Sequence, residues 1–195
     1  MHMKNIVVFC GSSAGQEPVY MEQAFQLGAA LAQRNTGLVY GGAKVGLMGA
    51  VADGALQAGG KVTGVLPHFL QQKELAHNGL TDLILVDTMH ERKTKMNELA
   101  DGVIALPGGF GTMEELFEML TWGQLGLHQK PIGMLNVNGF YDALHQLSQT
   151  MTEKGFLSAA NRDMLLYSDR IDDLLIKMEQ YQPVDKPKWI TPAQS

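Results

Sequence analysis

A carboxylate and an arginine are the two residues in this sequence best suited to carry out chemistry. Glu115 ends the glycine-rich segment PGGFGTMEE, which begins at Pro107. A carboxylate one turn beyond such a loop could act as a general base or stabilise a developing positive charge. Arg92 lies in the segment MHERKTKM, which begins at Met89, and its forked guanidinium could grip a phosphate or a sugar hydroxyl.

Both residues also have purely structural interpretations. Thr112 and Glu115 have the spacing of a capping box, in which two side chains satisfy backbone N–H groups at the start of a helix. Arg92 lies between Glu91 and Lys95, whose i,i+4 spacing is typical of an exposed charged helix face. Spacing alone is compatible with either role for each residue.

Three glycine-rich segments follow apolar runs, and they account for part of a glycine surplus. The chain has 22 glycines in 195 residues, about 11%, against a usual level of about 7%. The segments are CGSSAG from Cys10, GGAKVGLMG from Gly41 and PGGFG from Pro107. Glycine lets the backbone approach a ligand closely, and a helix that follows offers N–H groups and partial positive charge, so the third loop suits a phosphate. A tight strand–helix turn with no ligand remains the alternative.

The third loop does not match the common nucleotide-binding motifs. It is neither a Walker sequence nor G-x-G-x-x-G, because Glu114 stands where the third glycine would be needed. This weakens the case for a dinucleotide-dependent oxidoreductase.

Short apolar runs alternate with helix-period segments along the chain, which predicts an α/β fold with a parallel sheet and helices on both faces. Runs such as IVVFC and LILV are continuous rather than alternating, as expected for strands buried on both faces. The expected strands are Asn5–Cys10, Leu38–Tyr40, Lys61–Leu66, Leu83–Asp87, Gly102–Leu106, Pro131–Asn136 and Met164–Tyr167. The expected helices are Val19–Arg34, Gly46–Ala58, Met89–Ala100, Thr112–Leu125, Gly139–Lys154 and Asp169–Tyr181. Gly28 and Gly54 fall inside helices, where they are expected to permit close packing.

Composition excludes several classes of partner and site. The net charge is −5, with no cluster of Lys and Arg long enough to follow a nucleic acid backbone, so no nucleic acid partner is expected. The single cysteine, Cys10, excludes an internal disulfide and fits a reducing, cytoplasmic compartment. The six histidines are never three or four residues apart, and no metal site is expected. The apolar run from Ile6 to Cys10 is too short to span a membrane, so no membrane association is expected.

The length predicts one domain. We expect this domain to cover residues 1–182 and a C-terminal tail to cover residues 183–195, in which three of the seven prolines fall.

The motifs together resemble the LONELY GUY family of phosphoribohydrolases, long misnamed lysine decarboxylases. The likeness rests on CGSS from Cys10, YGG from Tyr40, MHERK from Met89 and above all PGGFGTMEE from Pro107, and it covers roughly residues 4–180. One departure is Ala43, where the family usually has a third glycine.

The resemblance implies a three-layer modified Rossmann fold and a homodimer with its active site near the interface. It implies hydrolysis of the N-glycosidic bond of adenosine-type 5′-monophosphates, N6-prenylated or plain, without a cofactor. Arg92 and Glu115 stand at the family's two catalytic positions. The expected substrate-binding residues are Gly11, Ser12, Ser13, Gly41, Gly42, Met89, Lys93, Pro107, Gly108, Gly109, Gly111 and Thr112.

Two alternatives remain open. The same glycine loops would serve a non-catalytic nucleotide or cofactor carrier. A literal amino-acid decarboxylase would need a lysine bound to pyridoxal phosphate in a much larger scaffold, and no Ser-x-His-Lys-like segment occurs in the sequence.

Overall fold

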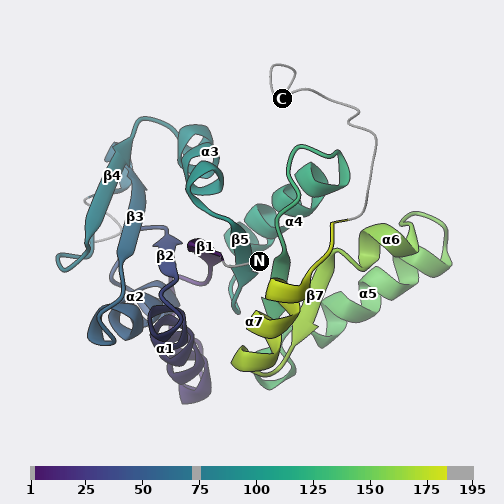
Figure 1. Cartoon of the computed structure of the whole chain (residues 1–195), viewed down its shortest axis with the longest axis horizontal. Coiled ribbons are helices and arrows are strands. Elements are labelled where there is room, and N and C mark those ends of the chain that lie inside the picture. Colours follow the sequence, from purple (N-terminus) through teal and green to yellow (C-terminus); the bar gives the residue numbers. More distant parts are fainter. Residues whose placement is uncertain (1–2, 72–75, 184–195) are drawn as a thin grey trace.

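The computed structural model describes residues 3–71 and 76–183, in which strands and helices alternate (Figure 1). The strands are β1 (Asn5–Phe9), β2 (Gly37–Tyr40), β3 (Val62–Pro67), β4 (Asp82–Val86), β5 (Gly102–Ala105), β6 (Ile132–Leu135) and β7 (Leu165–Ser168). The helices are α1 (Pro18–Gln33), α2 (Gly46–Gln57), α3 (Met89–Leu99), α4 (Phe110–Gln124), α5 (Asp142–Glu153), α6 (Ala159–Arg162) and α7 (Ile171–Gln180). Two 3-10 turns are η1 (His68–Leu70) and η2 (Val137–Gly139). Residues 184–195 of the expected tail lie outside the described residues.

The seven strands form one sheet in the order β4-β3-β2-β1-β5-β6-β7, and every neighbouring pair is parallel. The expectation of an α/β fold with a parallel sheet is confirmed. The chain builds outward from β1 in one direction as far as β4 and then returns to place β5 on the other side of β1. The strand order therefore reverses between β1 and β5, and in such sheets ligands bind beyond the carboxyl ends of the strands at this point.

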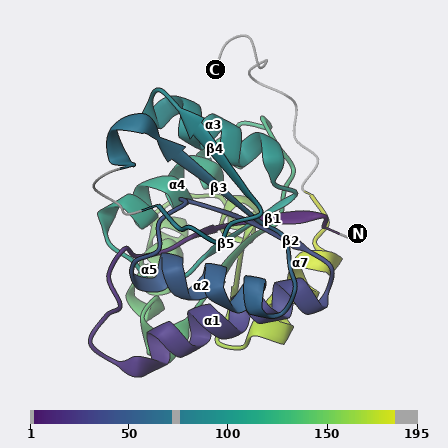
Figure 2. The ribbon, with the colours of Figure 1, turned by 90° about the vertical axis from the view of Figure 1, so that its left-hand side faces the viewer.

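Helices cover both faces of the sheet, which gives three layers (Figure 2). Figure 2 shows α1 and α2 on one side of the strands and α3 and α4 on the other. Side chains of β1 alternate between the two cores: Ile6 and Val8 pack with α1, α2 and α7, whereas Val7 and Phe9 pack with α3 and α4. This two-sided burial explains why the run IVVFC is continuously apolar.

Two glycines allow α1 and α2 to touch. A Cβ atom on Gly28 would lie 2.0 Å from the carbonyl oxygen of Val51, and one on Gly54 would lie 2.0 Å from that of Phe25. Each backbone therefore occupies the space that a side chain on the other helix would need. The expectation that these glycines permit close packing is confirmed.

The connection from β3 to β4 runs back over the sheet without an α-helix in the described residues. After η1 it includes the stretch Ala76–Thr81, here called the return segment. Leu80 packs against the core beneath α1 and α2, and the backbone N–H of Thr81 donates to the carbonyl of Val62 at 3.0 Å. The return segment thus lies on the same face of the sheet as α2.

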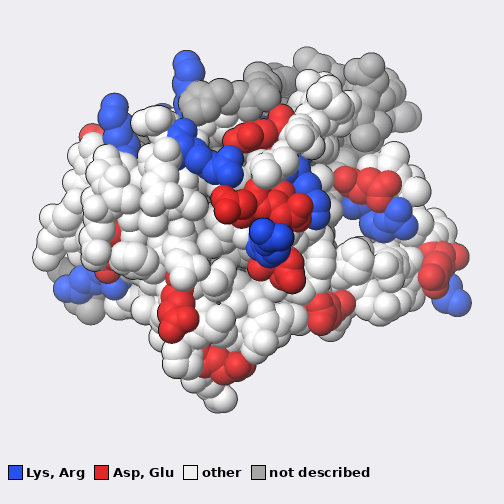
Figure 3. Space-filling model, turned by 60° about the horizontal axis from the view of Figure 1, so that its bottom comes forward, with Lys and Arg blue, Asp and Glu red and all other residues white. Residues whose placement is uncertain are grey.

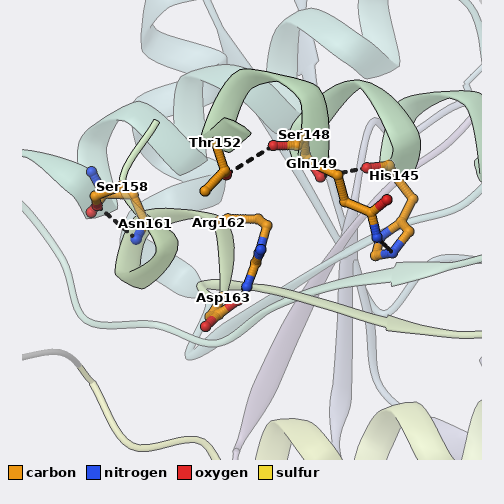
Figure 4. Close-up of polar contacts among 8 residues, drawn as sticks. All are labelled: His145, Ser148, Gln149, Thr152, Ser158, Asn161, Arg162 and Asp163. Atoms are coloured by element: carbon orange, nitrogen blue, oxygen red, sulfur yellow. Dashed lines mark hydrogen bonds and ion pairs between the residues drawn. The ribbon is translucent and has the colours of Figure 1, made fainter. Parts of the chain in front are cut away.

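Helix α6 was not expected from the sequence, and it is specified by local contacts (Figure 4). The Oγ of Ser158 accepts from the backbone N–H of Asn161 at 3.2 Å and caps the helix, and the guanidinium of Arg162 binds the neighbouring Asp163. The nearby α5 carries equally local bonds, such as that from the Thr152 hydroxyl to the Ser148 carbonyl at 3.0 Å. These contacts are local to the stretch between β6 and β7.

Charges of both signs are mixed on the surface shown in Figure 3. Acidic and basic side chains lie side by side near the middle of this face, and large areas carry neither. A face of this kind offers no continuous basic surface for a nucleic acid backbone. Within the described residues, no helix is long and apolar enough to cross a membrane.

Candidate active site

The three glycine loops meet beyond the carboxyl ends of β1, β2 and β5. The backbone N–H of Gly11 donates to the carbonyl of Pro107 at 3.0 Å, and the N–H of Leu47 donates to the carbonyl of Gly11 at 3.1 Å. A Cβ atom on Gly108 would lie 2.1 Å from the hydroxyl of Thr112. The loops are therefore joined to one another at the point where the strand order reverses.

A pocket of about 300 Å³ opens at this point. Nine of the residues expected at the site line it: Gly11, Ser12, Gly41, Met89, Arg92, Gly109, Gly111, Thr112 and Glu115. Ser13, Pro107 and Gly108 instead line an adjoining pocket of about 360 Å³, which shares Gly11, Ser12 and Gly109 with the first. Gly42 and Lys93 line neither of these two pockets.

Other residues complete the wall of the 300 Å³ pocket and were not expected to do so. They are Val8, Phe9, Cys10, Met48, Leu70, Met96 and Glu114. Cys10 and Met48 belong to the first two glycine-rich segments, so their positions in those segments were a usable signal. Leu70 had none, because η1 brings it to the pocket from the connection after β3.

Arg92 is buried, and the backbone of one strand and one glycine loop holds its guanidinium. Its Nε donates to the carbonyl of Val65 at 3.1 Å and its Nη2 to the carbonyl of Gly41 at 3.1 Å. Helix α3 directs it there, because Thr88 caps the helix by accepting from the N–H of Glu91 at 3.1 Å. Arg92 is thus a fixed cation at the pocket wall, with its orientation set by carbonyls of β3 and of the second glycine loop.

The alternative interpretation of Thr112 and Glu115 as a capping box is not supported, because Thr112 is not the N-cap residue of its helix. Helix α4 begins at Phe110, and its N-cap residue is Gly109, which has no side chain to make a capping hydrogen bond. Thr112 therefore lies inside the first turn and is buried, with its side chain against Gly108. The helix starts early because Gly109 takes the extended N-cap conformation directly after the loop.

The beginning of α4 forms one end of the pocket and could bind an anion there. The first N–H groups of a helix have no carbonyl of their own helix to bind, and they carry partial positive charge. Gly111 and Thr112 belong to this first turn and line the pocket. A phosphate placed there would meet backbone N–H groups and the Thr112 hydroxyl.

The only cysteine shares the pocket wall with Glu115. Burial raises the pKa of the Cys10 thiol far above its ordinary value, and the negative charge of Glu115 raises it further. The thiol is therefore neutral at physiological pH, and Glu115 is close enough for its charge to be felt at the pocket floor.

Lys93 joins the two helices that carry the candidate catalytic residues. Its Nζ donates to Glu114 at 2.7 Å and to Glu118 at 3.0 Å, so it connects α3 to α4. Burial lowers the pKa of Lys93, but the hydrogen bonds to the two carboxylates outweigh burial and raise the pKa above its ordinary value. Lys93 thus links α3 to α4 by ion pairs beside the pocket and is not part of its lining.

No candidate metal centre accompanies the pocket in the part of the chain that the structure describes. Among residues 3–71 and 76–183, no three His, Cys, Asp or Glu side chains are grouped so that they could hold a metal ion.

The fold and the pocket define a Rossmann-like α/β protein with a pocket at the reversal point of its sheet. A family model described as "Possible lysine decarboxylase" matches residues 48–178. The chain belongs to this family, the LONELY GUY family to which its motifs point.

Curated relatives match nearly the whole chain. A cytokinin riboside 5′-monophosphate phosphoribohydrolase of Arabidopsis thaliana is 44% identical over 191 residues, which cover 95% of this chain and 90% of the relative. A probable cytokinin riboside 5′-monophosphate phosphoribohydrolase of Oryza sativa subsp. japonica is 48% identical over 176 residues, which cover 90% of this chain and 79% of the relative.

Solved structures share the fold at lower identity. The molybdenum cofactor carrier protein of Chlamydomonas reinhardtii aligns with a TM-score of 0.68 and 19% identity, covering 90% of this chain and 96% of its own. The molybdenum cofactor binding protein of Rippkaea orientalis aligns with a TM-score of 0.67 and 23% identity, covering 91% and 96%. At these identities the likeness concerns the fold alone.

Proposed function

We propose that this protein hydrolyses the N-glycosidic bond of adenosine-type 5′-monophosphates, including N6-prenylated ones. The products are the free base and ribose 5-phosphate. One observation carries the proposal: Arg92, Glu115 and the first turn of α4 line the same pocket. The cytokinin riboside 5′-monophosphate phosphoribohydrolases named above, which match almost the full length of the chain, support the same reaction.

Glu115 and Arg92 have distinct roles in this reaction. As the bond between C1′ and the base breaks, positive charge develops on the ribose, and water adds to C1′ while the base leaves with a proton. The carboxylate of Glu115 stabilises that charge and orients or deprotonates the attacking water. Arg92 holds the substrate in place, and its own orientation is held by the carbonyls of Gly41 and Val65.

The phosphate is assigned to the first turn of α4 and the loop before it. Gly108, Gly109, Gly111 and Thr112 would bind it through backbone N–H groups and the Thr112 hydroxyl. The loop after β1 faces this position, and its residues Gly11, Ser12 and Ser13 would close around the ligand with Pro107. Gly41 and Met89 would border the rest of the substrate. Gly42 and Lys93 do not line the pocket and would support the residues that line it.

The test is base release from purified protein, followed by chromatography, with AMP and isopentenyladenosine monophosphate as substrates. We expect free base from at least one nucleotide, and a loss of kcat by a factor of about 100 or more in Glu115→Gln, the range typical of a lost general base. Glu153→Gln is the matched control, because Glu153 is an exposed carboxylate at the end of α5 and does not line the pocket. No base from either nucleotide, or a Glu115→Gln variant as fast as the wild type, contradicts the proposal.

The same experiment separates the enzyme from a carrier. A non-catalytic nucleotide or cofactor carrier would bind a phosphorylated ligand saturably in a calorimeter and release no base. Relative kcat/KM values for prenylated and plain AMP then define which base the pocket prefers.

We also propose that the protein acts as a homodimer with its active site near the interface. Phe110 is 96% exposed at the start of α4, and Phe117 and Met89 are exposed on α4 and α3. Large apolar side chains grouped around a pocket mouth favour contact with a second copy. Light scattering at micromolar concentration should give the mass of two chains, and Phe110→Glu should shift it toward one; a wild-type monomer contradicts this assignment.

We place the reaction in the cytoplasm. Cys10 is the only cysteine in the sequence and is a free, buried thiol. A free thiol and a nucleotide substrate both fit a reducing intracellular compartment. Microscopy of the tagged chain with compartment markers tests this assignment.

A further inference from the structure

The return segment is paired with the second glycine loop. The backbone N–H of His77 donates to the carbonyl of Gly42 at 3.0 Å, and Ala43 and Ala76 form an isolated antiparallel bridge. Gly42 adopts a positive φ of 81°, which favours glycine. The conformation of this loop therefore depends on a stretch of chain more than thirty residues further on.

Both ring nitrogens of His77 are engaged, which fixes the ring and its tautomer. Nδ1 accepts from the backbone N–H of Gly79 at 3.1 Å, and Nε2 lies 3.0 Å from Oδ1 of Asp53 on α2. Since Nδ1 is an acceptor, the neutral ring carries its proton on Nε2 and donates it to Asp53. The His77 side chain is only 12% exposed, so the ring is packed between α2 and the return segment, whereas the Asp53 side chain is 53% exposed.

The glycine loop lies between His77 and Arg92. The Gly42 carbonyl accepts from the His77 N–H, and the preceding carbonyl, that of Gly41, accepts from Nη2 of Arg92. Two consecutive carbonyls of one loop are thus held from opposite sides. A shift of Gly42 would move the Gly41 carbonyl, which is one of the groups that orient Arg92.

We propose that His77, oriented by Asp53, is a positioning residue that keeps Arg92 in its reactive orientation through the Gly41–Gly42 backbone. Neither His77 nor Asp53 is among the residues that line the 300 Å³ pocket, so neither is a catalytic residue. The expected effect of His77 on turnover rests on the proposed hydrolase function. Its expected effect on the orientation of Arg92 does not.

The primary test is a spectroscopic signature of Arg92. Because Nε of Arg92 donates to Val65 inside the protein, its N–H should give a protected side-chain resonance in ¹⁵N NMR spectra, assigned by its loss in Arg92→Lys. We expect His77→Ala to shift or broaden this resonance. His68→Ala is the matched control, because His68 lies in the same β3–β4 connection with its side chain 58% exposed, and it should leave the resonance unchanged. An unchanged resonance in His77→Ala overturns the proposal, whether or not the protein hydrolyses nucleotides.

Two conservative variants of His77 separate its hydrogen bond to Asp53 from its hydrogen bond to Gly79. Gln at position 77 can donate to Asp53 from near the Nε2 position, and Asn can accept from Gly79 near the Nδ1 position. Because the link to Asp53 is the one that ties the return segment to α2, His77→Gln should restore most of the Arg92 signal and His77→Asn should not. The reverse order of rescue contradicts the role assigned to Asp53.

Kinetics add a readout that simple loss of stability would not reproduce. We expect His77→Ala to lower kcat/KM about 10-fold in the wild-type background and to have little further effect in Arg92→Ala, because coupled residues are not additive. An equal fold-loss in both backgrounds overturns the proposal. If wild-type protein releases no base, the hydrolase function fails, and the NMR comparison still decides the role of His77.

Discussion

Arg92 depends on the absence of a side chain at Gly41. A Cβ atom there would lie 2.2 Å from Nη2 of Arg92 and 3.0 Å from the sulfur of Met48. The glycine is thus needed less for its own flexibility than for the approach of the guanidinium to the backbone. The motif YGG from Tyr40 therefore encodes the position of an arginine that lies fifty residues later in the chain.

Gly41→Ala should displace the Arg92 guanidinium from the Gly41 carbonyl. We expect kcat/KM for nucleotide hydrolysis to fall about 10-fold or more, a loss of about 1.4 kcal/mol of transition-state stabilisation. Circular dichroism should show that the variant remains folded, because the methyl group meets the end of a flexible side chain. A variant with wild-type kcat/KM would show that Arg92 reaches its position without this space.

At the scale of helices and strands, the sequence predicts the elements well but not the contacts between them. Apolar runs predicted all seven strands to within a few residues, because strands buried on both faces have little choice of side chain. The expectation that the run LILV is buried on both faces is wrong: it forms the edge strand β4, where Leu83 and Leu85 are 38% and 37% exposed. The start of α4 was misplaced because Thr112 and Glu115 fit a capping box that Gly109 makes unnecessary. The hydrogen bond between His77 and Asp53 joins residues from separate elements, and no local sequence pattern predicts such a pair.

His128 shows a contact of this kind with a measurable pH dependence. Its Nε2 lies 2.9 Å from the carbonyl of Met119 in α4, and its Nδ1 accepts from the N–H of Lys130 before β6. Burial lowers the pKa of His128; the hydrogen bond to Met119 opposes this shift, and the nearby charge of Lys130 adds to it. The imidazole is therefore neutral where it ties α4 to the following strand.

Stability should fall as the pH is lowered below about 6.5, the ordinary pKa of histidine. In that range His128 is protonated in the unfolded chain but remains largely neutral in the folded protein, where its pKa is lower. The contribution of the neutral ring to the free energy of unfolding is therefore complete above pH 6.5 and is lost below it. Urea unfolding at pH 7.5 and 5.5 should show a smaller dependence on pH in His128→Gln than in the wild type. The exposed His90→Gln serves as control, and equal pH dependence in wild type and His128→Gln contradicts the assignment.

For the molecule as a whole, one layer of helices is held by backbone contact. Gly28 and Gly54 let α1 and α2 touch over one side of the sheet, where they cover the core around β1. Because protein interiors are close-packed, an added methyl group at this contact must push two helices apart rather than fill a gap.

Gly54→Ala should therefore destabilise the whole chain by about 1–3 kcal/mol, the usual cost of overpacking, even though alanine favours helices more than glycine does. Gly111→Ala in α4 is the matched control for stability, because a Cβ atom there has no neighbour within 4 Å. Thermal and urea unfolding measure both variants. If Gly54→Ala is as stable as Gly111→Ala, the two helices are not in the tight contact described.

Because its only thiol lies on the pocket wall, the protein can report without modification whether a ligand occupies the pocket. Since the sequence has one cysteine and Cys10 lines the 300 Å³ pocket, any mass added by a thiol-specific label reports on that pocket and nowhere else. Its neutral, shielded state makes labelling slow, so the labelling rate follows how often the pocket floor is open to small molecules. Ligands can therefore be ranked by how well they protect Cys10, with no engineered probe and no need for turnover.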